Sequence, residues 1–306
     1  MSIIAQCGTT IDCPPRYDAV SRILASAADW DPHDPDFHLA LRERHATVSA
    51  ACIDRRSITS VLPNGSWCLS APFPGTSGRH SGGVVSLGNE THILPRSHYP
   101  PDRIVVAVLH ALLHNRIPSL EMDRPQSVND FGAGVGQYGH ALRMLDPGVD
   151  WRGYDGAGNV ENYTSGFVRF FDLTMPLSLP KADWLLSLEV GEHVPHQWEY
   201  MVLRNLHVHQ RRGIIVSWAA LGQLGTGHVN NHNQSYVRDR FLELGYEPHT
   251  ELERLLHNGD SQLLRAAPAS LPSYGQMRRN ILAFIKKRSP EVERSWIKGK
   301  GEPLER

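Results

Sequence analysis

The stretch Ser127-Val-Asn-Asp-Phe-Gly-Ala-Gly-Val-Gly-Gln-Tyr-Gly139 decides the fold of this 306-residue chain. It holds four glycines directly after a short run that ends in an acid, Asp130. Glycine lets backbone N–H groups approach a ligand without a side chain in the way, and the helix that follows points its N-terminus at that ligand. The last three glycines match the dinucleotide pattern G-x-G-x-x-G. The acid and the first three glycines read acid-x-G-x-G-x-G, so two cofactor classes fit the loop.

The pattern around this loop alternates between two kinds of element. Apolar residues at helical spacing or helix-start signals predict helices over 104–117, 137–145, 195–210 and 235–244. Runs typical of strands are 127–131, 150–155, 167–173, 182–190, 213–219 and 280–287. Strands that alternate with helices indicate an α/β fold with a doubly wound, mostly parallel sheet.

The chain divides into three parts by composition. Residues 1–101 are rich in Pro, Gly, Ser and His and contain one plausible helix, over 37–52. We expect this irregular extension to be either a lid on the substrate side or a structural wrap. The α/β domain is expected over 102–288, and the charged residues 289–306 form a tail.

Composition restricts the class of partner. Apolar residues make up 41%, charged residues 21%, and the net charge is −1. That balance is ordinary for a globular protein and gives no general field for nucleic acid or an anionic membrane. No run reaches the ~20 apolar residues of a membrane span, and no signal peptide is visible.

The cysteine pattern bears on the compartment. All four cysteines lie in the first quarter of the chain, without a C-x-x-C pair: Cys7, Cys13, Cys52 and Cys68. We expect free thiols in a cytoplasmic protein. A lumenal location stays open, and only there would the four N-x-S/T sequons matter. Nothing in the pattern fixes an oligomeric state.

Acids at the ends of the predicted strands suggest cofactor contacts, because ligands of open parallel sheets bind at the carboxyl ends of the strands. Asp155 closes the second strand, where a carboxylate can accept both hydroxyls of a ribose. Asp172 ends the third strand, where it can accept from an adenine amino group, with Leu173 as an apolar edge. The structural alternatives are a turn residue at Asp155 and an N-cap at Asp172.

The fourth strand ends in a cluster with chemistry of its own. Glu189, Glu192 and His193 form E-x-x-E-H, and the later loop GHVNNH offers His228 and His232, which we expect to face the same cleft. Carboxylates with one or two imidazoles suit Mg²⁺, Mn²⁺ or Zn²⁺. Three interpretations stay open: a metal site, His193 as general base or substrate orienter, and a structural role.

Four segments together resemble one enzyme family. They are Asp130-Phe-Gly-Ala-Gly-Val-Gly136, Tyr154-Asp155, Phe171-Asp172-Leu173 and Ser187-Leu-Glu-Val-Gly-Glu-His-Val-Pro195. Their order and spacing resemble those of class I S-adenosylmethionine (SAM) methyltransferases, and LEVGEHVP looks like the same segment of the ubiquinone-pathway O-methyltransferase group. The resemblance covers roughly 104–287 and implies a seven-stranded Rossmann-like sheet. Small-RNA 2′-O-methyltransferases use an E-x-x-E-H with one more histidine to hold Mg²⁺.

The resemblance implies residue roles. The residues expected to bind SAM are Asp130, Gly132, Gly134, Gly136, Asp155, Gly156, Asp172, Leu173 and Glu189. The expected catalytic residues are His193, Glu192 and His228, and the expected metal ligands are Glu189, Glu192, His193 and His228.

We therefore expect a SAM-dependent methyltransferase that acts on O or N of a small-molecule or sugar-like acceptor, with or without a divalent metal. The alternatives are an NAD(P)-dependent oxidoreductase, an RNA 2′-O-methyltransferase and an inactive SAM-binding subunit.

Overall fold

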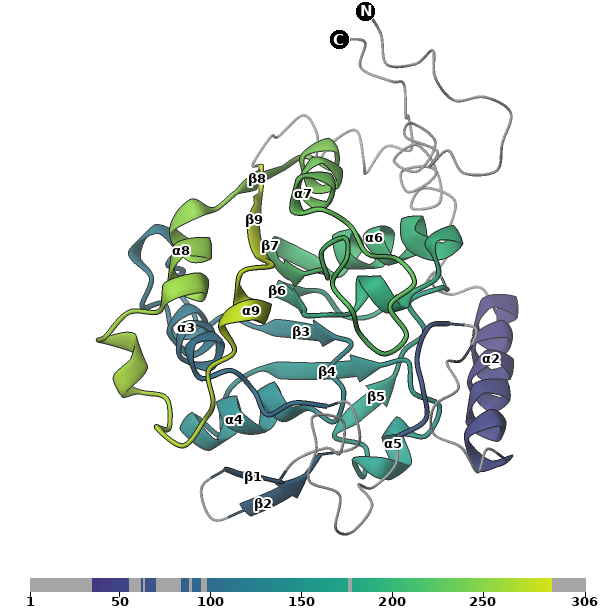
Figure 1. Ribbon diagram of the computed structural model, residues 1–306. Coiled ribbons are helices and arrows are strands. Elements are labelled where there is room, and N and C mark those ends of the chain that lie inside the picture. The colour runs from purple at the N-terminus through teal and green to yellow at the C-terminus, as the bar shows by residue number, and fades with distance from the viewer. Residues whose placement is uncertain are drawn as a thin grey trace, which may run out of the picture.

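The computed structural model describes residues 35–54, 62, 64–69, 84–87, 90–94, 98–175 and 178–287. A seven-stranded sheet forms the centre of the molecule (Figure 1). Its strands are β3 (Val128–Phe131), β4 (Trp151–Asp155), β5 (Val168–Phe170), β6 (Ala182–Ser187), β7 (Gln210–Ser217), β8 (Tyr246–Pro248) and β9 (Ile281–Lys286). A separate antiparallel pair joins β1 (Val84–Leu87) to β2 (Glu90–Ile93).

The strand order is β5-β4-β3-β6-β7-β9-β8. All neighbouring strands run parallel except β9, which is antiparallel to both β7 and β8. The sheet starts in the middle at β3, grows outward to β5, and then restarts at β6 on the other side of β3. This is the arrangement of the Rossmann-like methyltransferase fold, which confirms the predicted fold class. The carboxyl ends of β3 and β6 flank the point of reversal, where such sheets bind ligands.

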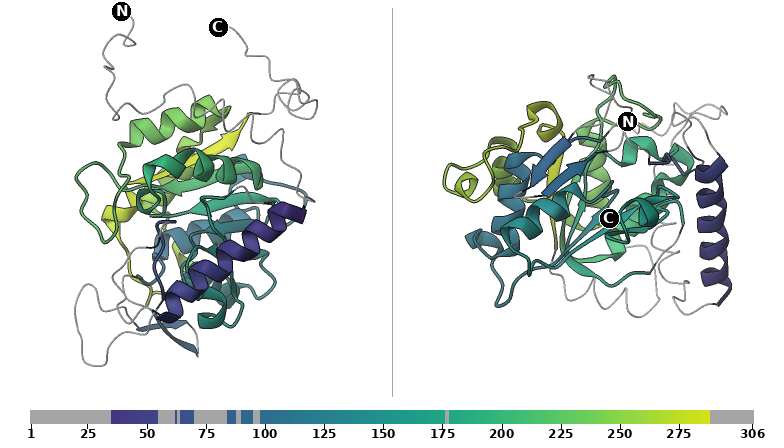
Figure 2. Two further views of the ribbon diagram at one scale, coloured as in Figure 1. Left: turned by 90° about the vertical axis from the view of Figure 1, so that its right-hand side faces the viewer. Right: turned by 90° about the horizontal axis from the view of Figure 1, so that it is seen from below.

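Helices cover both faces of this sheet (Figures 1 and 2). The α-helices are α2 (Pro35–Asp54), α3 (Arg103–Leu113), α4 (Gln137–Leu145), α5 (Val160–Tyr163), α6 (Glu199–Val208), α7 (Gln234–Glu243), α8 (Thr250–Asn258) and α9 (Gly275–Arg278). Short 3₁₀ turns are η2 (Pro118–Leu120), η3 (Gly191–His193), η4 (His196–Trp198) and η5 (Leu263–Arg265). One core contains α3, α4 and α8, and the other contains α6 and α7.

Alternation along the strands divides their side chains between the two cores. In β6, Trp184 and Leu186 belong to the first core and Leu185 to the second. Successive side chains of a strand point to opposite faces of the sheet, so a continuous apolar run is required where both faces are covered. This explains why the central strands read as unbroken apolar sequence.

Most predicted elements are confirmed. The helix expected over 137–145 is α4 with the same bounds, and the helix expected over 37–52 is α2. The helix expected over 195–210 begins as the 3₁₀ turn η4 and continues as α6. The strand expected over 167–173 is shorter, because its pairing with β4 ends at Phe170. Strand β8 and helix α8 were not predicted from the sequence.

Helix α2 lies against the carboxyl ends of the strands. Figure 1 shows α2 beside the arrowheads of β4 and β5. Arg44 on α2 donates to Asp172 at 2.8 Å, and Ser49 Oγ donates to the carbonyl of Gly158 at 2.6 Å. The domain boundaries at 101 and 288 stay predictions, and residues 289–306 lie outside the described residues.

A disulfide joins α2 to the segment that follows it. Cys52 is bonded to Cys68, with their Cα atoms 5.3 Å apart. The expectation of free thiols is therefore wrong for this pair, while Cys7 and Cys13 lie outside the described residues. Pairing depends on proximity in space, which the spacing of four cysteines does not reveal. Since disulfides persist in oxidising compartments, the free-thiol argument for a cytoplasmic location no longer applies. Across the described part of the chain, no helix has both the length and the apolar character needed to span a membrane.

Candidate functional site

The glycine loop between β3 and α4 needs its glycines for both backbone and packing reasons. Gly132, Gly134 and Gly136 have φ values of 77°, 58° and 80°, a region that L side chains rarely adopt. A Cβ on Gly132 would lie 2.2 Å from Cγ2 of Val190, and one on Gly136 would lie 2.6 Å from the ring of Phe167. The loop is thus a fixed backbone surface at the carboxyl end of β3.

Asp155, the last residue of β4, is bonded to this loop. The amide of Gly134 donates to its Oδ2 at 2.9 Å, and the amide of Ala157 donates to its Oδ1 at 2.9 Å. Each carboxylate oxygen has a further lone pair, so the group keeps capacity to accept hydroxyls. Burial raises the pKa of Asp155, while the two amides and His98 oppose that rise.

Asp130, the acid of the glycine motif, is buried beneath the loop. It accepts from Nε1 of Trp151 at 3.1 Å and is 3% exposed. Burial raises its pKa to about 7, the Trp151 bond opposes the rise, and the charge of Asp155 adds to it. Because it is buried, this carboxyl group affects a ligand indirectly, by holding the glycine loop in position.

Asp172 and Leu173 lie at the end of β5, and both are buried. Oδ2 of Asp172 accepts from Nε of Arg44, while Oδ1 accepts from the amide and the hydroxyl of Thr174 at 2.9 and 2.6 Å. Beside this pair opens a cavity of about 380 Å³. It is lined by Glu43, Arg44, Thr47, Thr174, Met175 and Trp198. The cavity therefore lies next to the residues predicted to face an adenine ring, not at the histidine cluster.

Residues 64–69, which we call the strap, cross the same edge of the sheet. The carbonyl of Gly156 accepts from Nδ2 of Asn64 at 3.1 Å and from Oγ of Ser66 at 2.7 Å. Leu69 exchanges two hydrogen bonds with the side chain of Asn159, at 2.9 and 2.8 Å. These hydrogen bonds fix the strap to the loop that follows β4.

The other side of the strap contacts the fourth-strand cluster. A Cβ on Gly65 would lie 2.2 Å from the carbonyl oxygen of His193, and the ring of Trp67 meets that of His193 edge-on at 4.9 Å. Trp67 also meets His98 edge-on at 6.3 Å, and a Cβ on Gly134 would lie 2.7 Å from Cδ2 of His98. Trp67 and His98 therefore cover the space above the glycine loop. Neither was singled out from the sequence, because the segments around these two residues carry no periodic pattern.

Glu189 lies just beyond β6 in a strained backbone conformation, with φ of 55°. Its amide donates to Oγ of Ser217 at 2.8 Å, and that hydroxyl donates to Oε1 of Glu189 at 2.8 Å. Nε2 of Gln223 donates to the other oxygen at 3.3 Å. Burial raises the pKa of Glu189, while Ser217, His228 and Gln223 oppose the rise. The carboxylate is thus held against the end of β7.

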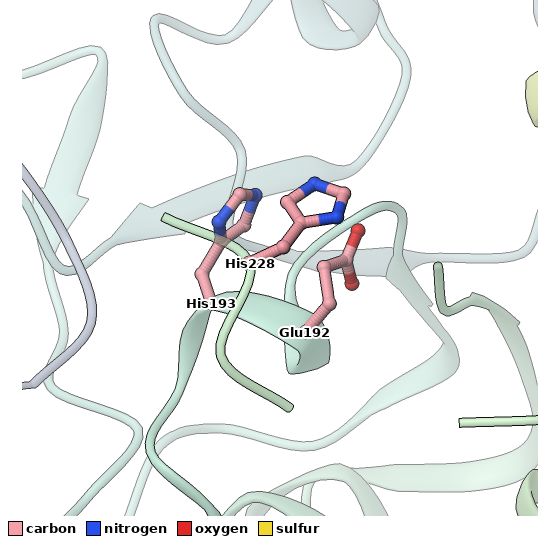
Figure 3. Close-up of side chains that lie close together, drawn as sticks. All are labelled: Glu192, His193 and His228. Atoms are coloured by element: carbon pink, nitrogen blue, oxygen red, sulfur yellow. The ribbon is translucent and has the colours of Figure 1, made fainter. Parts of the chain in front are cut away.

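Three of the four predicted metal ligands lie together: Glu192 and His193 on η3, and His228 on the loop after β7 (Figure 3). One ligand atom from each lies within 4.8 Å of the others. The two imidazole rings are 4.9 Å apart and inclined by 78°. Glu189 is outside this group but near it, because its charge raises the pKa of Glu192.

Hydrogen bonds set the orientation of the two imidazoles. Nδ1 of His193 lies 3.3 Å from the carbonyl of Gly227, and Nδ1 of His228 lies 3.1 Å from the carbonyl of Gln223. A carbonyl only accepts, so Nδ1 of each ring carries a proton, and Nε2 is the ring atom that can bind a ligand. The side-chain amide of Asn231 approaches His228 Nδ1 less closely, at 3.5 Å. Burial, followed by the charge of His228, lowers the pKa of His193 to about 4.

Glu192 is fully buried, and neither of its carboxyl oxygens makes a hydrogen bond within the described residues. Burial, and next the charge of Glu189, raises its pKa well above the usual range, although the amide of Ala219 lies close enough to oppose the rise. Its backbone carbonyl accepts from the amides of Val229 and Asn230 at 2.8 and 2.9 Å. A buried carboxyl group without partners is costly, so this group calls for a proton, a ligand or a cation.

His232 does not join His228, so that expectation is wrong. Its Nε2 contacts Oε2 of Glu199 at 2.6 Å, in a second cluster with His196. The loop between Gly227 and Asn233 is not helical, so residues four apart do not share a face.

Comparison with known proteins gives likeness of fold only. No family model matches this chain, and neither does any curated protein. Similar solved structures include the magnesium protoporphyrin IX methyltransferase of Synechocystis with bound SAM, with 17% identity, a TM-score of 0.39, and coverage of 60% of this chain and 79% of that one. The plantazolicin methyltransferase BpumL, in complex with a substrate analogue and S-adenosylhomocysteine (SAH), has 14% identity, a TM-score of 0.42, and coverage of 61% and 85%. An O-methyltransferase family protein from Burkholderia thailandensis has 13% identity, a TM-score of 0.38, and coverage of 61% and 55%.

Proposed function

We propose that this chain is a SAM-dependent methyltransferase. The observation that carries the proposal is the hydrogen bond between the amide of Gly134 and the carboxylate of Asp155. It joins a glycine loop and an acidic strand end at the carboxyl edge of the sheet, beside the point where the strand order reverses. The lone pairs left on Asp155 suit the two hydroxyls of a ribose, and we place the adenine in the cavity that Thr174, Met175 and Trp198 help to line.

The sulfonium of SAM supplies an activated methyl group, so the enzyme's main contribution is to position the acceptor atom. The residues that we expect to position the acceptor are Glu192, His193 and His228. The ring of Trp67 contacts both His193 and His98, and His98 lies over the glycine loop, so this cluster is close to the proposed cofactor site. Burial lowers the pKa of His193, so its Nε2 is free of a proton and can accept one from a hydroxyl. We therefore favour a hydroxyl acceptor on a small or sugar-like molecule over a nitrogen acceptor.

The same three side chains fit a divalent cation, and the two unpartnered oxygens of Glu192 support that version. Both imidazoles donate through Nδ1 to a backbone carbonyl, which is the outer-shell bond typical of metal-bound histidine. Glu189 is the fourth candidate ligand, once Gln223 releases it. A bound metal would lower the pKa of an acceptor hydroxyl and fix its orientation. Carboxylate and imidazole ligands together suit Mg²⁺, Mn²⁺ or Zn²⁺.

We further propose that the strap is a lid on the cofactor side. His98 rests on Gly134, where a ligand would approach the loop, so cofactor entry requires His98 and Trp67 to move. The strap's partners on the loop after β4 are a backbone carbonyl and the side chain of Asn159, both of which water can replace at modest cost.

Thermal unfolding tests the cofactor class. A ligand that binds only the folded state stabilises it by about 2.7 kcal/mol when present at 100 times its Kd. We expect SAH to raise the melting temperature and NAD⁺ to leave it unchanged. A rise with NAD⁺ alone would favour the oxidoreductase alternative instead.

Removal of metal ions tests the proposed cation at Glu192, His193 and His228 separately from the cofactor. Once an acceptor hydroxyl is in hand, EDTA should abolish methyl transfer, and Mg²⁺ or Mn²⁺ should restore it. If EDTA does not change turnover, the proposal of a metal at this site fails, and proton transfer to His193 or His228 remains.

The alternative acceptor is the 2′-hydroxyl of RNA. An assay of methyl transfer to a short RNA duplex tests this alternative.

A further inference from the structure

A second cluster of ligand-type side chains lies beside the first. His196 is on η4, Glu199 is the first residue of α6, and His232 is on the loop after β7. One nitrogen or oxygen atom from each lies within 4.8 Å of the others. The set is two imidazoles and one carboxylate, which is the donor set of many zinc sites with an open coordination position.

The nitrogen atoms of this cluster surround one oxygen atom, Oε2 of Glu199. It lies 2.6 Å from Nε2 of His232, 3.3 Å from Nδ1 of His196 and 3.0 Å from Nδ2 of Asn230. Zn–N and Zn–O bonds of about 2.0–2.1 Å in a tetrahedron place neighbouring ligand atoms roughly 3.3 Å apart. The His196 distance already has that value, and the His232 distance reaches it by a shift of about 0.7 Å.

The surroundings hold each ligand in place. The other oxygen of Glu199 accepts from the hydroxyl of Tyr236 at 2.5 Å, and the Tyr236 ring stacks on His232 with centroids 4.0 Å apart. Outer-shell bonds of this kind orient ligating carboxylates and imidazoles. Oδ1 of Asn230 lies 3.2 Å from Nδ1 of His196 and is a candidate fourth donor.

The exposure of the three side chains indicates how a cation would reach the cluster. The side chains of Glu199 and His232 are 7% and 17% exposed, whereas that of His196 is 46% exposed. A cation can therefore enter from solvent beside His196, with a water completing the coordination. Ligand identity, spacing, outer shell and entry path are the requirements for a metal site. This cluster meets the first, third and fourth, and its spacing fits once His232 shifts away from Glu199.

We propose that His196, Glu199 and His232 form a second divalent-metal site, selective for zinc-like cations, distinct from the Glu192 cluster. Its ligands join α6 to the loop that carries His228. Within that loop, Val229 and Asn230 bond the backbone of Glu192 through their amides. A cation here would stabilise the loop that presents His228, which is a structural role separate from the chemistry proposed for the first cluster.

Cobalt titration tests this site apart from the first one. Co²⁺ occupies zinc sites, and its visible ligand-field bands report coordination. The titration uses Glu192→Gln, which weakens the first cluster, alone and combined with His196→Ala. His196→Ala removes only one hydrogen-bonding side chain that is half exposed, so the fold should persist, as circular dichroism would verify. Glu192→Gln with His114→Ala is the matched control, because His114 pairs with Asp146 at 2.8 Å outside both ligand clusters of the described residues.

We expect Glu192→Gln to bind one equivalent of Co²⁺ with intense bands, displaced by Zn²⁺. Binding should weaken at least tenfold with His196→Ala and should persist with His114→Ala. If Glu192→Gln binds no Co²⁺, or if His196→Ala leaves binding unchanged, the cluster is a hydrogen-bonded network only and the proposal is overturned. Neither result bears on SAH binding, so the proposed function is tested independently.

Discussion

The amide of Gly134 donates to Oδ2 of Asp155 across 2.9 Å, so the middle of the glycine loop is tied to the end of the neighbouring strand. The second oxygen of Asp155 accepts from the amide of Ala157. One carboxylate thus fixes two turns and keeps a further lone pair on each oxygen. This single group links the shape of the loop to the polar face expected to hold a ribose.

Replacement of Asp155 by Asn should weaken SAH binding. An amide side chain has one accepting oxygen, so either Gly134 or Ala157 would face an NH₂ group instead. The unpaired N–H costs about 1–3 kcal/mol, and we expect SAH affinity, measured by calorimetry, to fall at least tenfold. Asp150→Asn is the control, since the side chain of Asp150 is half exposed and pairs with Arg152. Equal affinity for the wild type and Asp155→Asn would remove Asp155 from the cofactor site.

Changes at Glu192 should separate chemistry from cofactor binding. Glu192→Gln keeps the shape of the side chain but removes the charge that a cation or an acceptor would meet. We expect SAH affinity to be unchanged within a factor of about two, while Mn²⁺ binding at this cluster and methyl transfer are lost. The double change Glu192→Ala with His193→Ala should behave in the same way, and Glu247→Gln, on the exposed edge strand, is the control. Loss of SAH binding in Glu192→Gln would show that the cluster is structural.

The disulfide should govern how firmly the strap is held. Cys52 and Cys68 are separated by 16 positions, and a cross-link over such a loop contributes about 3 kcal/mol. The Cys52→Ser/Cys68→Ser pair should lower the melting temperature and speed SAH dissociation in stopped-flow traces. Asn64→Ala loosens the strap without touching the cross-link and should speed dissociation as well. If both variants release SAH at the wild-type rate, the strap is not a lid.

Replacement of Asp130 by Asn should stabilise the protein at alkaline pH. Burial raises the pKa of Asp130 from 3.8 to about 7, so the folded state binds more protons than the unfolded state between these values. The protonated carboxyl group of Asp130 therefore adds to the free energy of unfolding below pH 3.8, and this stabilisation is lost as the pH rises through 7. The loss amounts to about 4 kcal/mol at most. The charged group that faces it is Asp155, whose charge adds to the rise in pKa.

The amide introduced by Asp130→Asn would still accept from Trp151 and has no proton to lose. We expect the melting temperature of this variant to exceed that of the wild type at alkaline pH, and the two to converge only as the pH falls to about 4. The opposite trend, with the largest gain at acid pH, would mean that Asp130 is ionised in the folded state at low pH.

Features formed within one short segment could be predicted from the sequence, whereas contacts between distant segments could not. The glycine loop and α4 were predictable because turn geometry and helix periodicity lie within one short segment. Glu192 and His193 come together because they are adjacent at a strand end. Trp67 reaches the site from a segment without periodicity. Arg44 lies on a predicted helix, but its contact with Asp172 depends on how that helix packs, which only the folded chain shows. His232 was misplaced because the sequence does not give the course of an irregular loop.

The most direct test of the central claim is calorimetric titration of the wild-type protein with SAH and, in parallel, with NAD⁺. We predict one saturable SAH site per chain with micromolar or tighter affinity, at least tenfold weaker in Asp155→Asn, and no heat of binding from NAD⁺. Saturable binding of NAD⁺ with none of SAH would contradict the assignment of a methyltransferase.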